Sequence, residues 1–433
     1  MQLSLPITAQ LEITEICNFR CQHCYRLDSD YQPDVVSDET VMAAARALAE
    51  NKVFNIIITG GEPLTRPKLL EQLLDYFDKM DCNISINTNL TLLDDNFIEM
   101  FKKYSVRNLL VSCPSFDKEE YETITRTKRT HGFDRFKKNL AILSESGIHY
   151  TINMVVNQLN KNSVYETAVF VKSLGSKSFG ATPMALNPLY PRKDLLLTVD
   201  EVQRMLLELV RVQKELGLEI DVMEALPKCV IPEQLVRDGV FFTKRKCQAG
   251  ITVCAVSAKG DVRPCTHNPK SYGNLIETPL KEIWQNMSAW RQMDFVPDEC
   301  RNCQLVASCH GACRINAMTL NGSLKERDIW MQEPIKDAKL NKNTIELSPD
   351  TKLRLVKCKI KIRPETDGYT LVCGRNGRQV TVVNDEVLKL INIIGEKELT
   401  VSEIAKIGDT DADNPKVKSI LRHLINHKLM KIC

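Results

Sequence analysis

The feature that most constrains the fold is a regular alternation of short β-rich runs and longer amphipathic runs between residues 10 and 225. Six runs have the composition of short strands: Leu11–Thr14, Asn55–Thr59, Ile84–Asn87, Asn108–Ser112, Tyr150–Val156 and Ser178–Ala181. Five amphipathic helices are predicted between them: Asp38–Asn51, Pro67–Met80, Asp94–Lys103, Phe133–Ser146 and Ser163–Leu174. Asp38 is the expected N-cap of the first helix. This alternation predicts an α/β fold, a partial (β/α)6 TIM barrel whose functional groups lie at the carboxyl ends of the strands.

Three cysteines follow the first predicted strand at the spacing CxxxCxxC. They are Cys17, Cys21 and Cys24. Thiolates are soft ligands that suit an iron–sulfur cluster or zinc. A zinc site needs a fourth Cys or His nearby, and His23, between two of the cysteines, is poorly placed to supply it. Three thiolates instead hold three irons of a [4Fe–4S] cube and leave one iron open. A structural zinc site, or plain thiols, is the alternative interpretation of this loop.

The second predicted strand ends in a turn that begins with two glycines. Gly60 and Gly61 allow the backbone to approach a ligand closely. Glu62 then offers an acceptor for a hydrogen bond, and Pro63 stiffens the exit of the turn. An ordinary βα turn is the alternative interpretation.

In this order, the two motifs resemble the radical S-adenosylmethionine (radical SAM) superfamily, whose cluster loop is CxxxCxΦC with Φ aromatic. Here His23 fills the Φ position, and the GGEP motif follows one βα unit later. The resemblance implies that Cys17, Cys21 and Cys24 hold a [4Fe–4S] cluster that binds SAM. It also implies a set of SAM-binding residues: Gly60, Gly61, Glu62, Pro63, Asn89, Ser112, Arg126 and Asn157. A turn or cap role is open for the last four, and Ser112-Cys113-Pro114-Ser115 departs from the family's Ser-Leu-Asp-Gly.

A second group of cysteines follows between residues 247 and 313. Its members are Cys247, Cys254, Cys265, Cys300, Cys303, Cys309 and Cys313. The chain has 16 cysteines, and its N-terminus has no basic segment followed by an apolar core, so we expect no secretory signal. Clustered cysteines in such a chain indicate metal binding rather than disulfides. Two tetrahedral zinc sites are the alternative.

The spacing of this second group resembles the SPASM domain, an extension of radical SAM enzymes that binds one or two auxiliary [4Fe–4S] clusters. The resemblance implies that Cys247, Cys265 and Cys313 hold the first auxiliary cluster, with Cys254 as a candidate fourth ligand. Cys300, Cys303 and Cys309 would hold the second. The family's seventh cysteine is absent, because Met331 stands near its position. The fourth ligand of the second cluster is therefore open between Asp328, an iron without a protein ligand and the distant Cys358.

The last part of the chain has the pattern of a small α+β domain. Residues 333–350 are polar and predict a linker. Three β-like runs follow, separated by the hairpin signals Asp367-Gly368 and Asn376-Gly377. The expected elements are the runs Arg354–Ile362, Tyr369–Cys373 and Gln379–Val383, then the helices Glu386–Ile393, Val401–Ile407 and Pro415–His427.

This pattern resembles the winged-helix-like precursor-recognition domain (RiPP recognition element) of peptide-modifying enzymes, which is similar to the peptide chaperone of the pyrroloquinoline quinone pathway. The resemblance implies that the leader of a precursor peptide adds a strand to an exposed sheet edge. A DNA-binding winged helix is the alternative, since Lys416–Lys428 is basic. The net charge of the whole chain is only +3, which argues against nucleic acid as a partner.

Three domains are therefore expected: a radical SAM partial barrel at residues 1–225, a SPASM auxiliary-cluster domain at 226–340 and a winged-helix-like peptide-recognition domain at 351–433. No apolar run reaches the roughly 18 residues of a membrane span. We expect a cytoplasmic protein without a membrane partner.

The resemblances imply an enzyme that cleaves SAM reductively with an electron from a flavodoxin- or ferredoxin-type donor. The 5′-deoxyadenosyl radical would then modify a ribosomally made precursor peptide, forming a thioether or carbon–carbon crosslink. Three alternatives stay open: residue oxidation of the sulfatase-maturing type, a step of haem or quinone-cofactor biosynthesis, and an iron–sulfur redox-sensing regulator. The sequence identifies no general acid or base.

Overall fold

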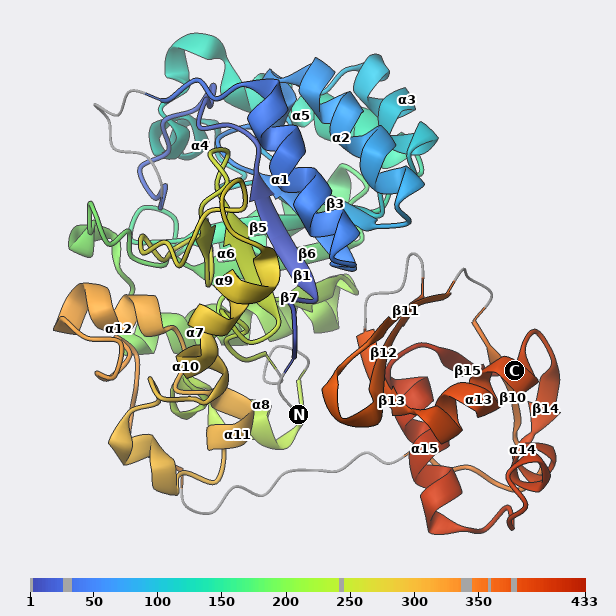
Figure 1. Cartoon of the computed structure of the whole chain (residues 1–433). Helices are drawn as coiled ribbons and strands as arrows, with labels where there is room; N and C mark the ends of the chain where they lie inside the picture. The colour runs from blue at the N-terminus through green and yellow to red at the C-terminus, as the bar shows by residue number, and fades with distance from the viewer. Residues whose placement is uncertain (1–2, 26–32, 241–244, 336–344, 357–359, 375–379) are drawn as a thin grey trace.

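The computed structural model describes residues 3–25, 33–240, 245–335, 345–356, 360–374 and 380–433 (Figure 1). Its centre is a nine-stranded sheet in the order β7-β6-β5-β4-β3-β2-β1-β8-β9. Neighbouring strands are parallel except β8 and β9. The strands are β1 Thr8–Glu12, β2 Asn55–Thr59, β3 Asn83–Thr88, β4 Asn108–Ser112, β5 Tyr150–Val156, β6 Ser178–Pro183, β7 Glu219–Asp221, β8 Val253–Val256 and β9 Val262–Arg263. Among the described residues β7 and β9 have no further partner strand, so the barrel is open, as predicted.

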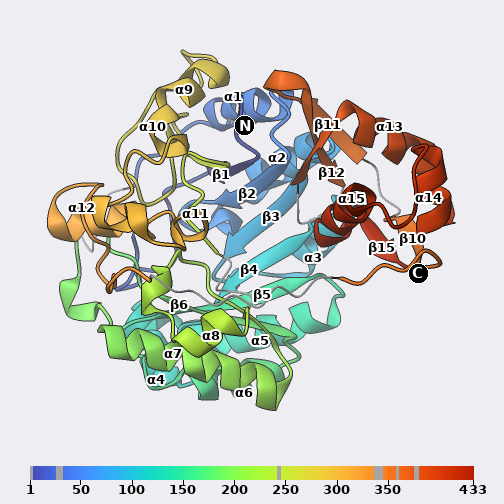
Figure 2. The same ribbon diagram turned by 90° about the horizontal axis from the view of Figure 1, so that it is seen from below.

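Helices connect the strands and lie around the outer side of the curved sheet (Figure 2). They are α1 Asp38–Glu50, α2 Pro67–Lys79, α3 Asp95–Lys103, α4 Lys118–Thr125, α5 Gly132–Glu145, α6 Val164–Ser173 and α7 Val199–Arg211. Each presents one apolar stripe to the sheet; in α2 the stripe includes Leu70, Leu73 and Phe77, all fully buried. Burial of a side chain of this size stabilises the fold by about 1.5–3 kcal/mol. The amphipathic pattern is therefore what fixes the helices on the sheet.

The expected strands and helices are present, with small shifts at their ends. The expected N-cap of α1 is wrong: the Ser37 side chain accepts a hydrogen bond from the Thr40 N–H. Asp38 is the first helical residue and instead pairs with Arg66. The last helix of the barrel, α7, ends at Arg211 and continues as a π-helical turn, Val212–Leu216.

A strand pairing and two side-chain hydrogen bonds attach the cysteine-rich segment to the barrel. Its strand β8 pairs with β1, so the central sheet continues beyond residue 225. Two buried tryptophans donate hydrogen bonds to the barrel chain, Trp284 to the Leu3 carbonyl and Trp330 to the Leu197 carbonyl, each at 2.9 Å. The helices of this segment are α8 Glu233–Arg237, α9 Leu280–Asn286, α10 Ser288–Arg291, α11 Val306–Cys309 and α12 Arg314–Asn321.

The described part of the C-terminal domain contains two three-stranded antiparallel sheets and three α-helices. The sheets have the orders β14-β10-β15 and β11-β12-β13. The elements are β10 Lys352–Leu355, β11 Ile360–Pro364, β12 Tyr369–Gly374, β13 Val380–Asn384, α13 Asp385–Ile394, β14 Glu398–Thr400, α14 Val401–Ile407, α15 Pro415–Asn426 and β15 Met430–Ile432. The first expected run thus divides into β10 and β11, in different sheets. Asp367-Gly368 precedes β12 as expected, whereas Asn376-Gly377 lies outside the described residues.

The β11-β12-β13 sheet packs against the amino ends of the barrel strands, where the red domain meets the barrel in Figure 1. Phe54, Leu371 and Cys373 form a small buried core between them. Arg363, 4 % exposed, donates hydrogen bonds to the carbonyls of Leu5 and Pro6 at 2.9 and 2.8 Å. Among the described residues no helix has both the length and the apolar character needed to cross a lipid bilayer.

Candidate active site

The loop that carries the first three cysteines leaves the carboxyl end of β1 and is held by the end of α4. The Arg20 N–H donates to the Thr125 carbonyl at 3.3 Å, and the Gln22 N–H donates to the Ile124 carbonyl at 2.9 Å. Phe19 is buried edge-on against Tyr121, with the ring centroids 6.4 Å apart. Helix α4 was not predicted from the sequence, yet it positions this loop.

Cys17, Cys21 and Cys24 line one cavity of about 350 Å³ at the carboxyl ends of the strands. Burial raises the pKa of Cys17 to about 12 and that of Cys21 well above its usual value, and the charge of Cys24 raises both further. Three thiolates at this position therefore need a cationic partner, which an iron–sulfur core provides. Burial lowers the pKa of His23 to about 4, so its ring is neutral at physiological pH. These residues fit the predicted cluster.

The two glycines of the GGEP turn lie directly on the backbone that precedes Cys17. The Gly61 N–H donates to the Thr14 carbonyl at 2.7 Å, and the Glu62 N–H donates to the Ile16 carbonyl at 2.8 Å. A Cβ atom on Gly60 would lie 2.3 Å from the Thr14 oxygen, and one on Gly61 would lie 2.2 Å from the Ile16 oxygen. The glycines are thus required for contact between the two motifs.

Glu62 is a buried carboxylate at the side of the cavity, 1 % exposed. It accepts hydrogen bonds from the Thr88 hydroxyl at 2.8 Å, the Asn89 N–H at 2.7 Å and the Leu64 N–H at 3.1 Å. Burial raises its pKa to about 7, although these three donors favour the charged form. A cation such as the ammonium group of SAM would complete the site, because it would stabilise the carboxylate.

Four residues beyond the GGEP motif were expected to contact SAM, and the structure brings two of them to the cavity. Asn89 lines it and donates from its side chain to the Asn18 side chain in the cluster loop at 2.8 Å. Ser112, at the end of β4, is exposed to the cavity. Arg126 does not line it; this exposed residue ends α4 with φ 55°.

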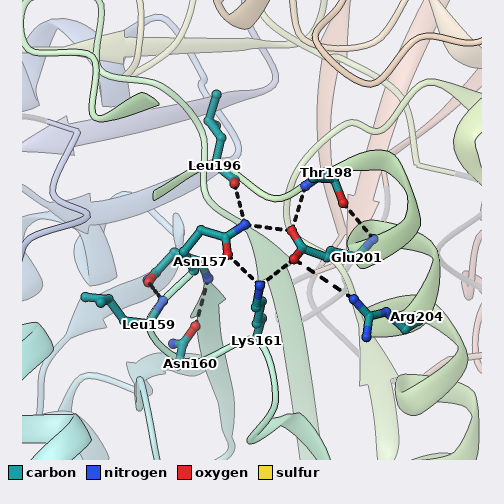
Figure 3. A network of polar contacts seen from close by, with 9 residues as sticks. Asn157, Leu159, Asn160, Lys161, Leu196, Thr198, Glu201 and Arg204 are labelled. Atoms are coloured by element: carbon teal, nitrogen blue, oxygen red, sulfur yellow. Dashed lines mark hydrogen bonds and ion pairs between the residues drawn. The ribbon is translucent and has the colours of Figure 1, made fainter. Parts of the chain in front are cut away.

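Asn157, the fourth residue, is also away from the cavity, because its polar groups form a turn after β5. Its N–H donates to the Asn160 side chain at 2.7 Å, and its side-chain oxygen accepts from the Leu159 N–H at 2.9 Å (Figure 3). Lys161, at the end of this turn, pairs with Glu201 at 2.5 Å. The turn therefore joins β5 to α7 and has a structural role.

The cavity also contains polar residues that the sequence analysis missed. The Thr182 hydroxyl donates to the Asn153 side chain at 2.8 Å, and both line the cavity. At the other side lie Glu224 and His267, and the His267 ring contacts the Tyr25 ring at 4.4 Å. Asn153 could have been found as a polar residue within a strand, whereas no sequence motif around Glu224 indicates a functional role. The cavity thus extends from the cluster loop to the cysteine-rich segment.

The thiols of Cys247, Cys265 and Cys313 form a first auxiliary set beside this cavity. Burial raises the pKa of Cys247 to about 11 and that of Cys265 to about 12. Burial also raises the pKa of Cys313, and the charges of Glu224 and Asp328 add to this effect. The potential ligand atoms of Glu224, His267 and Cys313 all lie within 4.8 Å of one another. Carboxylate groups therefore accompany these three thiols.

Cys254 and Asp328 do not take the positions expected of them. Cys254 lies on β8, opposite Ala9, and burial alone raises its pKa to about 12, with no contribution from another thiolate. Asp328 was one of three possibilities for the fourth ligand of the second auxiliary set, and its charge raises the pKa of Cys247 and Cys313 of the first set. It is 3 % exposed, and burial raises its pKa to about 7. The sequence could not assign these residues, since the folding of distant segments decides their neighbours.

Cys300, Cys303 and Cys309 form a second auxiliary set around a separate small cavity of about 20 Å³. Cys229 and Met331 also line this cavity. The Cys300 and Met331 sulfur atoms are 3.8 Å apart. Cys358, considered above as a ligand, lies outside the described residues. Both auxiliary sets consist of clustered sulfur donors, the ligand type that iron–sulfur clusters require.

Comparison with known families agrees with this geometry. Residues 11–171 match the radical SAM superfamily, and residues 247–304 match SPASM, described as an iron–sulfur cluster-binding domain. The first match contains the CxxxCxxC loop and the GGEP turn. The second contains four cysteines of the two auxiliary sets.

Individual relatives share these two parts of the chain. An AdoMet-dependent heme synthase of Methanosarcina barkeri is 25 % identical, covering 73 % of this chain and 93 % of the relative. The antilisterial bacteriocin subtilosin biosynthesis protein AlbA of Bacillus subtilis is 27 % identical, covering 69 % of this chain and 66 % of AlbA.

Among solved structures, Streptococcus suis SuiB bound to its precursor peptide SuiA superimposes with a TM-score of 0.62 and 19 % identity, covering 75 % of each chain. This likeness shows a shared fold. From the family matches, the cysteine motifs and the fold, we conclude that the chain is a SAM-dependent iron–sulfur enzyme with a radical SAM domain at residues 11–171 and a SPASM domain at residues 247–304.

Proposed function

We propose that this enzyme modifies a ribosomally made precursor peptide and forms a thioether or carbon–carbon crosslink in it. The observation that carries the proposal is the combination of a cavity running from the cluster loop to the first auxiliary set with a C-terminal domain that has an open sheet edge. The names of two relatives support it: AlbA is a biosynthesis protein for a bacteriocin, and SuiB was crystallised with a precursor peptide.

The cavity residues divide into those that would hold the cofactor and those that would meet the peptide. Cys17, Cys21 and Cys24 would hold the [4Fe–4S] cluster, and Glu62 would accept the ammonium group of SAM, with Asn89 and Ser112 beside it. With SAM bound, the cluster supplies a 5′-deoxyadenosyl radical that can remove a hydrogen atom from the substrate.

The opposite wall of the cavity would hold the peptide. Asn153 and Thr182 offer hydrogen bonds to a peptide group, and the apolar side chains of Val155 and Met184 exclude water. Two titratable groups, Glu224 and His267, line the wall next to the first auxiliary set. They are the candidates for receiving a proton from the substrate or for completing the ligands of that set.

The first auxiliary set would hold a cluster with three thiolate ligands from Cys247, Cys265 and Cys313. In this proposal Glu224 or Asp328 supplies an oxygen ligand, or a substrate thiolate takes that position. Cys254, the candidate fourth ligand, lies on β8 opposite Ala9 and is not used in this proposal. A cluster held by these residues would supply an acceptor for the electron that the peptide loses after the hydrogen atom has been removed.

The leader of the peptide would add a strand to β13, which pairs only with β12 among the described residues. Backbone N–H and C=O groups on an edge strand are the donors and acceptors that such an addition uses. On the face of β13 away from the barrel, the Thr381 hydroxyl forms a hydrogen bond with the His423 ring of α15 at 2.5 Å. We propose a cytoplasmic reaction with an electron from a flavodoxin- or ferredoxin-type protein.

The test is an anaerobic reaction of the reconstituted enzyme with SAM, a reductant and the peptide encoded beside its gene. We expect 5′-deoxyadenosine by chromatography and a peptide that has lost two hydrogen atoms by mass spectrometry. A variant lacking Cys17, Cys21 and Cys24 is the control and should form neither product. Formation of 5′-deoxyadenosine without any change in the peptide would contradict the substrate assignment.

A haem-biosynthesis step is the second candidate, because the heme synthase of M. barkeri is among the relatives. The C-terminal domain distinguishes the two functions. If the peptide is the substrate, removal of residues 351–433 should abolish leader binding in fluorescence anisotropy. A haem precursor that is consumed equally by the enzyme and this variant would favour the second candidate.

A further inference from the structure

Cys229 belongs to no cysteine motif of the sequence, but the fold places it at the second auxiliary set. It lies on the short turn Lys228–Val230, before Cys247, the first cysteine of the second group. The turn packs on Cys300, Cys303 and Cys309, and the four cysteines line the same small cavity. The fold therefore brings a fourth cysteine thiol to the second auxiliary set.

Backbone donors point at two of these sulfur atoms. The Gln332 N–H donates to the Cys229 sulfur at 3.2 Å, and the Lys228 N–H donates to the Cys309 sulfur at 3.4 Å. N–H groups that donate to sulfur are typical of iron–sulfur sites, where they tune the charge on the thiolates.

A buried cation lies beside the same set. Lys228 is 3 % exposed, and its ammonium nitrogen has no hydrogen-bond partner among the described residues. Its positive charge favours the thiolate form of Cys309, that is, it lowers the pKa of this thiol. A buried, unpaired ammonium group is costly unless an anionic group lies near it. A cluster with four thiolate ligands is such a group.

We propose that Cys229 is the fourth ligand of the second auxiliary cluster, which then has four thiolate ligands and no open iron. The proposal rests on the proposed function, because it takes Cys300, Cys303 and Cys309 as ligands. The other candidates fit less well: Asp328 does not line this cavity, and the Met331 thioether, which does, is a weaker ligand than a thiolate. The second cluster would therefore transfer electrons, and a substrate could bind only at the first.

The experiment uses the full chain with Cys17, Cys21 and Cys24 replaced by alanine, so that only auxiliary clusters remain. This parent and its Cys229→Ala, Cys229→Ser and Cys82→Ala derivatives are reconstituted anaerobically. Cys82 is a matched control because it is buried in the barrel, where its thiol contacts the Val53 carbonyl. Iron content and the electron paramagnetic resonance (EPR) spectra of the reduced proteins are measured with and without cyanide, which binds open irons.

We expect about eight irons in the parent and in Cys82→Ala. Cys229→Ala should either lose up to about four irons or gain a cyanide-sensitive EPR signal that the parent lacks. Cys229→Ser should keep its irons but show a shifted signal, since an oxygen ligand replaces sulfur. Cys229→Ala and Cys229→Ser spectra identical to the parent's, at the same iron content, would overturn the ligand assignment. A parent without auxiliary irons would overturn the proposed function as well. This outcome is measured on the parent alone, so it is distinguished from any effect of the substitutions at Cys229.

Discussion

Replacement of Gly61 by alanine is expected to destroy the N-terminal cluster site and to spare both auxiliary sets. The added methyl would lie 2.2 Å from the Ile16 oxygen and 2.7 Å from the Glu15 oxygen, where contacts below 3.0 Å essentially never occur. The turn and the cluster loop would have to separate by at least about 0.8 Å. Gly61 itself has no positive φ, so the effect is purely steric.

The energetic cost follows from the hydrogen bonds that hold the two motifs together. Separation breaks the bonds from the Gly61 N–H to Thr14 and from the Glu62 N–H to Ile16. Each buried donor or acceptor left without a partner costs about 1–3 kcal/mol. With one such cost for each of the two bonds, the expected loss in the free energy of unfolding is about 2–6 kcal/mol. Cys17 follows Ile16 directly, so the displacement reaches the first cluster ligand.

Urea denaturation and iron analysis of the reconstituted protein measure the two effects. The matched control is Gly217→Ala: Gly217 has φ 67°, and no atom lies within 4 Å of the position that the added methyl would take, so only backbone strain of about 1–2 kcal/mol is expected. Gly61→Ala should retain about eight irons of roughly twelve, whereas the control should retain all. If Gly61→Ala kept both its stability and its full iron content, the close contact would not be what joins the motifs.

Three further predictions concern charged groups. Glu62→Gln removes a charge-assisted hydrogen bond worth about 1.5–3 kcal/mol, so the Kd for SAM should rise about 10- to 100-fold in anaerobic equilibrium dialysis; an unchanged Kd would contradict the role of Glu62. Glu201 has a pKa lowered to about 2, chiefly by the Lys161 hydrogen bond, so its stabilisation is present above about pH 4.5 and is lost as the pH falls towards 2. Glu201→Gln should therefore lower the free energy of unfolding by about 1–3 kcal/mol at pH 7, and the difference between the wild-type protein and the variant should vanish in acid; a difference that does not change with pH would refute this. Lys228→Gln removes a unit positive charge that, at a separation of roughly 7 Å from the cluster and an effective dielectric of about 20, stabilises the reduced cluster by about 2 kcal/mol. The midpoint potential of the second auxiliary cluster should therefore fall by roughly 100 mV in an EPR-monitored titration, and a rise would exclude this role.

The sequence predicted most of the barrel because its strands are short apolar runs bounded by polar residues. β2, β4 and β5 have the expected ends. The strand β7 was missed because a run of three residues carries no periodicity. The helix α4 was missed because its sequence, KEEYETIT, is mostly polar and has few apolar positions from which to read a helical face.

In the candidate site, too, residues of contiguous motifs could be predicted, whereas residues whose partners are distant in the sequence could not. The CxxxCxxC loop and the GGEP turn are contiguous motifs, so their chemistry could be predicted. Cys229 and Glu224 were not found, because their partners are distant in the sequence and only the fold brings them together. Asn157 was assigned to SAM from its place after a strand, but its side chain is used by the following turn.

If a leader binds at β13 as proposed, the position of the C-terminal domain limits which residues of the peptide can react. Its β11-β12-β13 sheet contacts the amino ends of the barrel strands, and the cavity lies at their carboxyl ends. Strands of five to seven residues span roughly 20 Å. A peptide anchored at β13 would have to run along the outside of the barrel before entering the cavity, and about eight to ten extended residues cover such a path. The spacing between leader and modified residue, rather than the sequence between them, would then select the site of modification.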